Sequence, residues 1–165
     1  MVGTGPLRAV KYTRTLILVG LALVLGAVDA SILRKEHVKR EGEVVYLELA
    51  PRDPRSLMQG DYMALDFALA RQLGTGAAAR PKGFIPVAVD ERRVAHLAAA
   101  GDASPLRIQY RIRKGRPWLG TNAFFFEEGS GARYQQARFG EFRVDRESGE
   151  AILVGLRDKD LNALQ

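Results

Sequence analysis

The chain has 165 residues, 47% apolar and 27% charged, as expected for one folded domain with at most a short appendage. It has no cysteine and only two isolated histidines, His37 and His96, which excludes disulfide scaffolds, thiolate metal sites and cysteine nucleophiles. Of the formal net charge of +6, residues 1–40 carry +5, with seven basic and two acidic side chains, and residues 41–165 carry +1, with 18 and 17. Because the basic segment flanks an apolar run, we expect a lipid bilayer as a partner, and no nucleic acid.

The first predicted element is a membrane-spanning helix over residues 15–33. This run is apolar except for Asp29, and basic residues flank it on both sides. As a helix it would be about 28 Å long, close to the roughly 30 Å hydrocarbon thickness of a bilayer. We therefore expect a single-pass membrane anchor, although the basic residues on its two sides are nearly balanced and do not by themselves fix its orientation.

A cleaved signal peptide is the alternative interpretation of this segment. Its uncharged part, residues 15–28, follows a basic start and has the length of the apolar core of a signal peptide, and cleavage after Ala30 would leave Ser31 as the first residue. We favour the uncleaved anchor because apolar residues resume at Ile32 and Leu33. Both interpretations export the rest of the chain.

Asp29 is the one ionisable residue within the expected span. A carboxylate at this depth either reaches the headgroups or pairs with a polar residue of a neighbouring membrane subunit. We therefore keep Asp29 as a candidate partner contact.

After a polar linker expected at residues 34–42, the pattern changes to the two-residue period of strands. The clearest case is Leu106–Arg113, whose strict alternation is typical of an antiparallel sheet with one face in water. We expect residues 43–165 to form a mainly β domain, an antiparallel sheet or sandwich-like fold with a short helix at 131–139. Other strands are predicted at 44–49, 62–69, 84–90, 94–99, 118–126, 141–146 and 151–157, with a helix as the alternative at 90–100.

The most distinctive stretch covers residues 49–67. Its prolines favour a stiff loop over residues 50–59, which leads into a strand at Gly60. In that strand Leu65 and Phe67 would face the core, and Tyr62 the opposite side. We interpret the stretch as architectural, with the acidic side chains Asp53 and Asp61 accepting backbone N–H bonds and Arg52 or Arg55 neutralising them.

The run Gly60-Asp-Tyr-Met-Ala-Leu-Asp-Phe67 resembles the signature of the GDYXXLXY protein family, and the preceding Asp53-Pro54-Arg55 resembles the Asp-Pro-Arg that accompanies it. Residues 124–156 are similar to the C-terminal half of that family. The chain departs from the signature at Phe67, which replaces the final Tyr. The resemblance implies a small protein anchored in a bacterial inner membrane, with residues 1–14 in the cytoplasm and the domain after the anchor in the periplasm. Such proteins are often encoded beside multi-spanning membrane proteins, so we expect a multi-spanning membrane protein as a partner. The resemblance implies no biochemical activity.

Ser56-Leu-Met-Gln-Gly-Asp61 also resembles the end of a signal-peptidase motif. The position of that family's nucleophile, eight residues before the Gly, is occupied here by Arg52. The lysines available for a serine–lysine dyad lie in polar or turn contexts, at Lys82, Lys114 and Lys159. A residual hydrolase is therefore the weaker interpretation.

Three further groups of residues have both a structural and a functional interpretation. Glu127 and Glu128 are expected to serve a loop and a helix start, since neighbouring strand residues point to opposite faces. The aromatic run 124–126, with Trp118, is expected to be core on both faces of a covered strand. A basic stripe on the wet face of one strand is either solvated and paired with carboxylates or a partner contact; it comprises Arg107, Arg111 and Arg113.

The sequence contains no cofactor motif, no metal-ligand spacing and no credible catalytic constellation. We therefore expect a non-catalytic accessory or scaffold subunit of a membrane complex. The alternative is a membrane-tethered ligand-binding module or the residual hydrolase.

Overall fold

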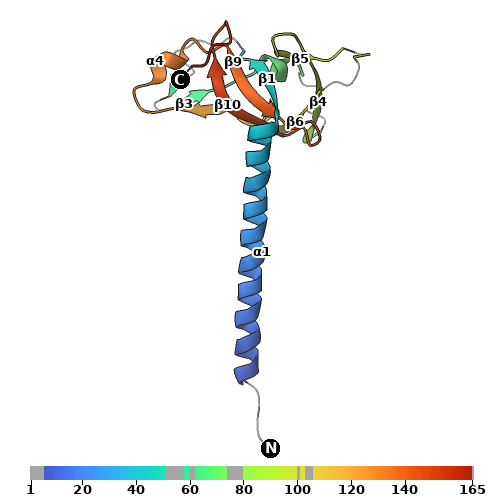
Figure 1. Cartoon of the computed structure of the whole chain (residues 1–165), viewed down its shortest axis with the longest axis vertical. Helices are drawn as coiled ribbons and strands as arrows, with labels where there is room; N and C mark the ends of the chain where they lie inside the picture. Colours follow the sequence, from blue (N-terminus) through green and yellow to red (C-terminus); the bar gives the residue numbers. More distant parts are fainter. Residues whose placement is uncertain are drawn as a thin grey trace, which may run out of the picture. The chain divides into compact units, whose positions relative to one another are not determined.

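The computed structural model describes residues 6–50, 58–59, 62–73, 80–99, 101–102 and 106–164. A long N-terminal helix precedes a region of short strands (Figure 1). In chain order the elements are α1 Pro6–Glu41, β1 Glu43–Glu48, β2 Met58–Gln59, β3 Tyr62–Ala64, α3 Ala68–Gln72, β4 Lys82–Val89, β5 Ala95–Leu97, β6 Leu106–Arg113, β7 Arg116–Trp118, β8 Ala123–Phe125, α4 Gly131–Tyr134, β9 Phe139–Val144 and β10 Ala151–Arg157.

The helix α1 exposes large apolar side chains between Leu16 and Leu33. Its 36 residues make about 54 Å of helix, more than a bilayer core requires. Among the described residues it is the one helix long and apolar enough to cross a membrane. Its exposed apolar side chains include Leu16, Ile17, Leu18, Val19, Leu21, Leu23, Val24, Leu25, Val28, Ile32 and Leu33.

The end of α1 lies beyond the expected span 15–33 and includes most of the expected linker 34–42. Lys39 and Arg40 occupy its last turn, where cations interact favourably with the helix dipole. The chain divides into two units, residues 1–37 and 38–165. Val38 is only 2% exposed, so the last turn of the helix belongs to the second unit, here called the β-domain.

The strand β1 connects the sheets of the β-domain. One edge pairs antiparallel with β9, which in turn pairs with β10 in the order β1-β9-β10. On its other edge the amide of Tyr46 donates to the carbonyl of Arg93 at 2.8 Å, and an antiparallel bridge joins Leu49 to Phe67. β1 and the residues that directly follow it are therefore hydrogen-bonded to segments from three distant parts of the chain.

The largest sheet has the order β5-β4-β6-β7 and is antiparallel throughout. The strand β6 spans Leu106–Arg113, as predicted, and the turn into β7 places Lys114 and Gly115 at φ 49° and 74°. Two positive φ values in a two-residue loop match the right-handed twist of the strands. Residues 95–97 form β5, so of the two alternatives at 90–100 the strand is correct.

The strand predicted at 62–69 is shorter than expected. β3 ends at Ala64 and pairs with β2 and β8, and the chain then enters α3 at Ala68. Burial still alternates over residues 62–67, and Leu69 and Ala70 on α3 also face the core. The helix buries Leu69, which a continued strand would also have buried, so the two-residue pattern does not show where the strand ends.

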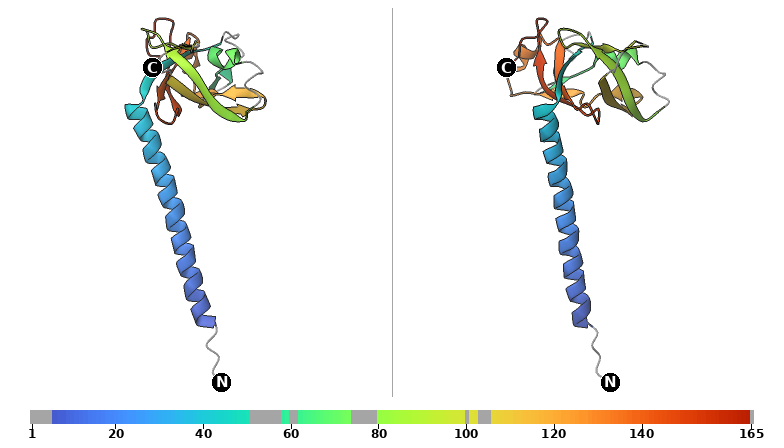
Figure 2. Two further views of the ribbon diagram at one scale, coloured as in Figure 1. Left: turned by 90° about the vertical axis from the view of Figure 1, so that its right-hand side faces the viewer. Right: turned by 45° about the vertical axis from the view of Figure 1, so that its right-hand side comes forward.

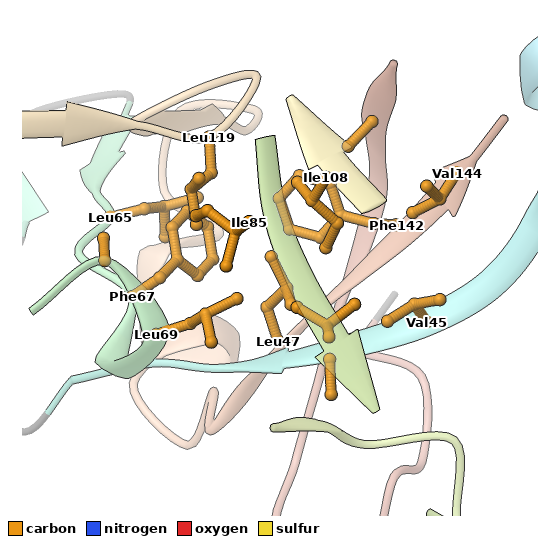
Figure 3. Packing of buried hydrophobic residues seen from close by; sticks show 14 of the residues in the cluster. Val45, Leu47, Leu65, Phe67, Leu69, Ile85, Ile108, Leu119, Phe142 and Val144 are labelled. Atoms are coloured by element: carbon orange, nitrogen blue, oxygen red, sulfur yellow. The ribbon is translucent and has the colours of Figure 1, made fainter. Parts of the chain in front are cut away.

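The core lies between the β1-β9-β10 sheet and the β4-β6 pair, which the views in Figure 2 show as separate layers. Ile85 and Ile108 come from one side, and Val45, Phe142 and Val144 from the other (Figure 3). All five are completely buried. Because the whole cluster belongs to residues 45–156, the β-domain has a hydrophobic core of its own.

Candidate functional site

The signature segment is described only from Tyr62 onward. Leu65 and Phe67 are buried, and the Phe67 ring meets the Phe142 ring edge to face at a centroid distance of 5.3 Å. These two residues therefore lie in the core, as the alternation indicated. The other candidate residues of this segment lie outside the described residues, namely Asp53, Pro54, Arg55, Gly60 and Asp61, together with Ser56.

Tyr62 lies on the side of β3 opposite to Leu65, and its ring is 5.7 Å from that of Phe125 on β8. Phe125 is 75% exposed, so the prediction that the aromatic run is core on both faces is wrong at this position. Its neighbours Phe124 and Phe126 pack against Tyr134 of α4, with centroids 5.1 and 5.2 Å apart. The small β2-β3-β8 sheet buries one face only, and Phe125 belongs to the other.

Glu127 and Glu128 are both exposed in the loop between β8 and α4. The hydroxyl of Ser130 donates to the backbone carbonyl of Glu127 at 2.6 Å, just before α4 begins at Gly131. The segment is therefore a loop that leads into a short helix, as expected.

The three arginines of the predicted stripe are exposed on β6, but they do not have the carboxylate partners expected of a solvated face. The Cζ atom of Arg113 lies 4.3 Å from the ring centroid of Trp118, and that of Arg107 lies 5.2 Å from the centroid of Phe84. Within the described part of the chain, no ion pair includes Arg107, Arg111 or Arg113. Their neighbours are aromatic rings on adjacent strands.

Strand register extends the stripe to both neighbouring strands. Directly opposite residues of an antiparallel pair point to the same face, and Arg111 lies opposite Lys82 on β4 and Trp118 on β7. Arg113 lies opposite Arg116, and both Lys82 and Arg116 are exposed. We call this surface the basic face; it comprises Lys82, Phe84, Arg107, Arg111, Arg113, Arg116 and Trp118.

Sequence reasoning missed Phe84, Trp118, Lys82 and Arg116 as members of this surface. Phe84 was assigned to a strand and Trp118 to the core, but 48% of Phe84 is exposed. Only the pairing of β4, β6 and β7 brings these side chains beside the arginines. The alternation within β6 contains no information about which residues lie opposite.

The carboxyl groups with a shifted pKa, Asp90 and Asp158, form hydrogen bonds within turns. The carboxylate of Asp90 accepts the amide of Val94 at 2.8 Å, and this bond lowers the pKa of Asp90, with a smaller contribution from His96. The pKa of Asp158 is lowered mainly by hydrogen bonds from Asn162. Both carboxylates accept hydrogen bonds within turns, and these bonds explain their lowered pKa values without a functional site.

The remaining candidates do not converge on a site. Asp29 is exposed on α1, and His37 and His96 are both exposed on different units. Over the described ranges, no three metal-binding side chains lie close enough together to hold an ion. The basic face is therefore the surface on which the structure brings predicted candidate residues together.

The comparisons agree with the motif. The model of a family described as GDYXXLXY protein matches residues 24–156, which is most of the chain. Neither the search of curated proteins nor the search of solved structures found a match.

Proposed function

The chain belongs to the GDYXXLXY protein family, and on that premise we propose that it is a non-catalytic accessory subunit of a membrane protein complex. In this proposal α1 anchors the chain in a bacterial inner membrane. The β-domain lies on the periplasmic side, where it is presented to a multi-spanning membrane protein.

The observation that carries the proposal is the surface of α1. Eleven large apolar side chains between Leu16 and Leu33 are exposed around the helix. A soluble helix buries its apolar stripe and keeps its other face polar, whereas a helix that is apolar all round requires lipid or other helices. This pattern supports a spanning anchor that holds a separately folded β-domain.

The basic face supports a binding role for the β-domain. It is an exposed surface built from three strands whose positive charge is not neutralised by described carboxylates. A surface of this kind is suited to a partner of opposite charge.

Topology is tested by fusing an enzyme that is active only after export to the C-terminus at Gln165. We expect activity in cells, and an inactive but stable fusion would contradict the periplasmic placement. The first residue of the mature chain tests the anchor. Met1 or Val2 supports it, whereas Ser31 would show that the segment is a cleaved signal peptide.

The subunit role is tested by mild detergent extraction followed by purification and mass measurement. Stable co-purification of a multi-spanning membrane protein in fixed stoichiometry supports it. A monomer that binds a free peptide or saccharide instead favours the ligand-binding module.

A further inference from the structure

We propose that the basic face binds an extended acidic polypeptide segment of the membrane partner. This inference rests on the proposed accessory role, because it specifies which kind of segment of the membrane partner the β-domain binds.

The positive charge of residues 41–165, which form the β-domain apart from the end of α1, is concentrated on this face. Residues 41–165 hold 18 basic and 17 acidic side chains, and five of the basic ones lie on the basic face. The rest of this region therefore holds 13 basic and 17 acidic side chains, a net charge of −4. A nearly neutral domain with one strongly positive surface attracts an acidic partner in a defined orientation.

The aromatic rings hold the guanidinium groups in place. The guanidinium of Arg113 lies over Trp118, whose indole N–H is itself fixed by a hydrogen bond to the carbonyl of Gly120 at 2.9 Å. A guanidinium that stacks on a ring through its face keeps its N–H edges available for hydrogen bonds. Planar N–H pairs of this kind fit carboxylates in bidentate geometry.

The same stacking argues against two other classes of partner. Nucleobases bind by stacking on open aromatic faces, but Arg107 lies over Phe84 and Arg113 lies over Trp118. Insertion of these rings into a bilayer would require the guanidinium charges to be moved away first. The rings act as supports for the arginines, and the exposed surface of each ring lies beside a positive charge.

The spacing of the arginines favours an extended segment. Arg111 and Arg113 are two residues apart on β6, about 7 Å, and Arg107 lies about 13 Å from Arg111. Carboxylates at alternate positions of an extended chain have this same repeat. A segment with Asp or Glu at every second residue can therefore place its acidic side chains against the row.

The test uses the full chain in nanodiscs of zwitterionic phosphatidylcholine. The probe is a fluorescent ten-residue peptide of alternating Glu and Thr, and the comparison peptide has Gln in place of Glu. We expect the Glu peptide to bind at least about tenfold more tightly, with an affinity that falls as salt is raised.

Two triple variants with the same change in net charge separate the basic face from charge in general. The first is R107Q, R111Q and R113Q, and the matched control is R92Q, R133Q and R138Q, three exposed arginines elsewhere on the β-domain. We expect the first to lose about tenfold or more in affinity for the Glu peptide and the control to change less than about twofold. Unchanged circular dichroism and thermal unfolding confirm that both fold.

Three results would overturn the proposal. Equal binding of the two peptides is one, and equal losses in the two triple variants is another. The third is protection of β6 amides from hydrogen exchange in nanodiscs that contain phosphatidylglycerol, without binding of the Glu peptide, which would assign the face to the bilayer.

Failure of the accessory role gives a different result. If the wild-type chain co-purifies with a membrane protein and the basic-face variant retains it equally well, the subunit role stands and this docking surface is wrong. If the wild-type chain co-purifies with nothing, the accessory role itself is wrong, whatever the peptide experiment shows.

Discussion

The guanidinium of Arg157 on β10 lies against the carboxylate of Glu141 on β9, with Nε donating to Oε2 at 2.6 Å and Nη2 contacting the same oxygen. Glu141 is 8% exposed and is the one charged residue that is buried in the described part of the chain. Arg157 also donates to the carbonyl of Leu161 at 3.4 Å and lies 6.0 Å from the ring centroid of Tyr46. The pair therefore connects β1, β10 and the C-terminal segment.

Replacement of Glu141 by Gln leaves the Arg157 charge without its partner. Loss of one member of a buried pair costs several kcal/mol, and Arg157 is partly exposed, so we expect a loss of about 2–3 kcal/mol in the free energy of unfolding. Urea unfolding of residues 38–165 measures it. Glu127→Gln, at an exposed site, is the control with the same change, and equal stability of the two variants would show that the pair contributes nothing.

The turn at the end of α1 leaves no room for a side chain at Gly42. A Cβ there would lie 2.3 Å from the carbonyl oxygen of Val38 and 3.1 Å from the amide nitrogen of Val144, both backbone atoms that cannot move aside. We expect Gly42→Ala to lower the free energy of unfolding by about 1–3 kcal/mol. Gly155→Ala on β10 is the control, since nothing lies within 4 Å of its Cβ. Similar melting temperatures for the two variants would contradict the close approach.

Two phenylalanines, Phe67 in the signature and Phe125 on β8, differ in exposure. Phe67 is 3% exposed in the core and Phe125 is 75% exposed on β8. We expect Phe67→Ala to cost about 3–5 kcal/mol, because it removes a ring from the packing with Phe142, and Phe125→Ala to cost less than about 1 kcal/mol. Denaturant unfolding of both variants measures the difference. A large loss for Phe125 would mean that its pairing with Tyr62 is a structural contact.

The Asp90 carboxylate stabilises the turn between β4 and β5 only while it is ionised. Its pKa in the folded protein lies below the ordinary 3.8, so its contribution is complete above that value and is lost as the pH falls through the folded pKa. We expect Asp90→Asn to destabilise residues 38–165 at about pH 5 and to differ less from the wild type at about pH 3. Thermal unfolding at both pH values measures this, and a constant difference would show that the charge has no role.

Much of the β-domain could be predicted from the sequence because one face of each sheet is buried. Leu106–Arg113 alternates without exception, and its observed boundaries are those predicted. Ala151–Arg157 follows the hairpin loop that contains Gly149, which adopts φ 70°. In both cases the local pattern and the tertiary structure require the same conformation.

The other features of the fold and of the basic face depend on pairing between distant strands, which local sequence patterns do not reveal. Leu69 is buried on a helix as well as it would be on a strand, so periodicity could not locate the end of β3 at Ala64. Phe125 is exposed because β8 is one strand of a small sheet with only one covered face. The rings beneath Arg107 and Arg113 come from strands whose register is set by the fold.

The position of β1 between several distant segments determines when this domain can complete its folding. Glu43 pairs with Val144, 101 positions further along the chain, and the other edge of β1 bonds to Arg93. Contacts of such long separation close late, so the edge of β1 that faces β9 remains unpaired until β9 has been synthesised. An unpaired strand edge that waits in this way is exposed to aggregation, and a chain shortened before residue 139 would never acquire the strand with which β1 pairs. Folding of the β-domain is therefore expected to follow synthesis, as one late cooperative step.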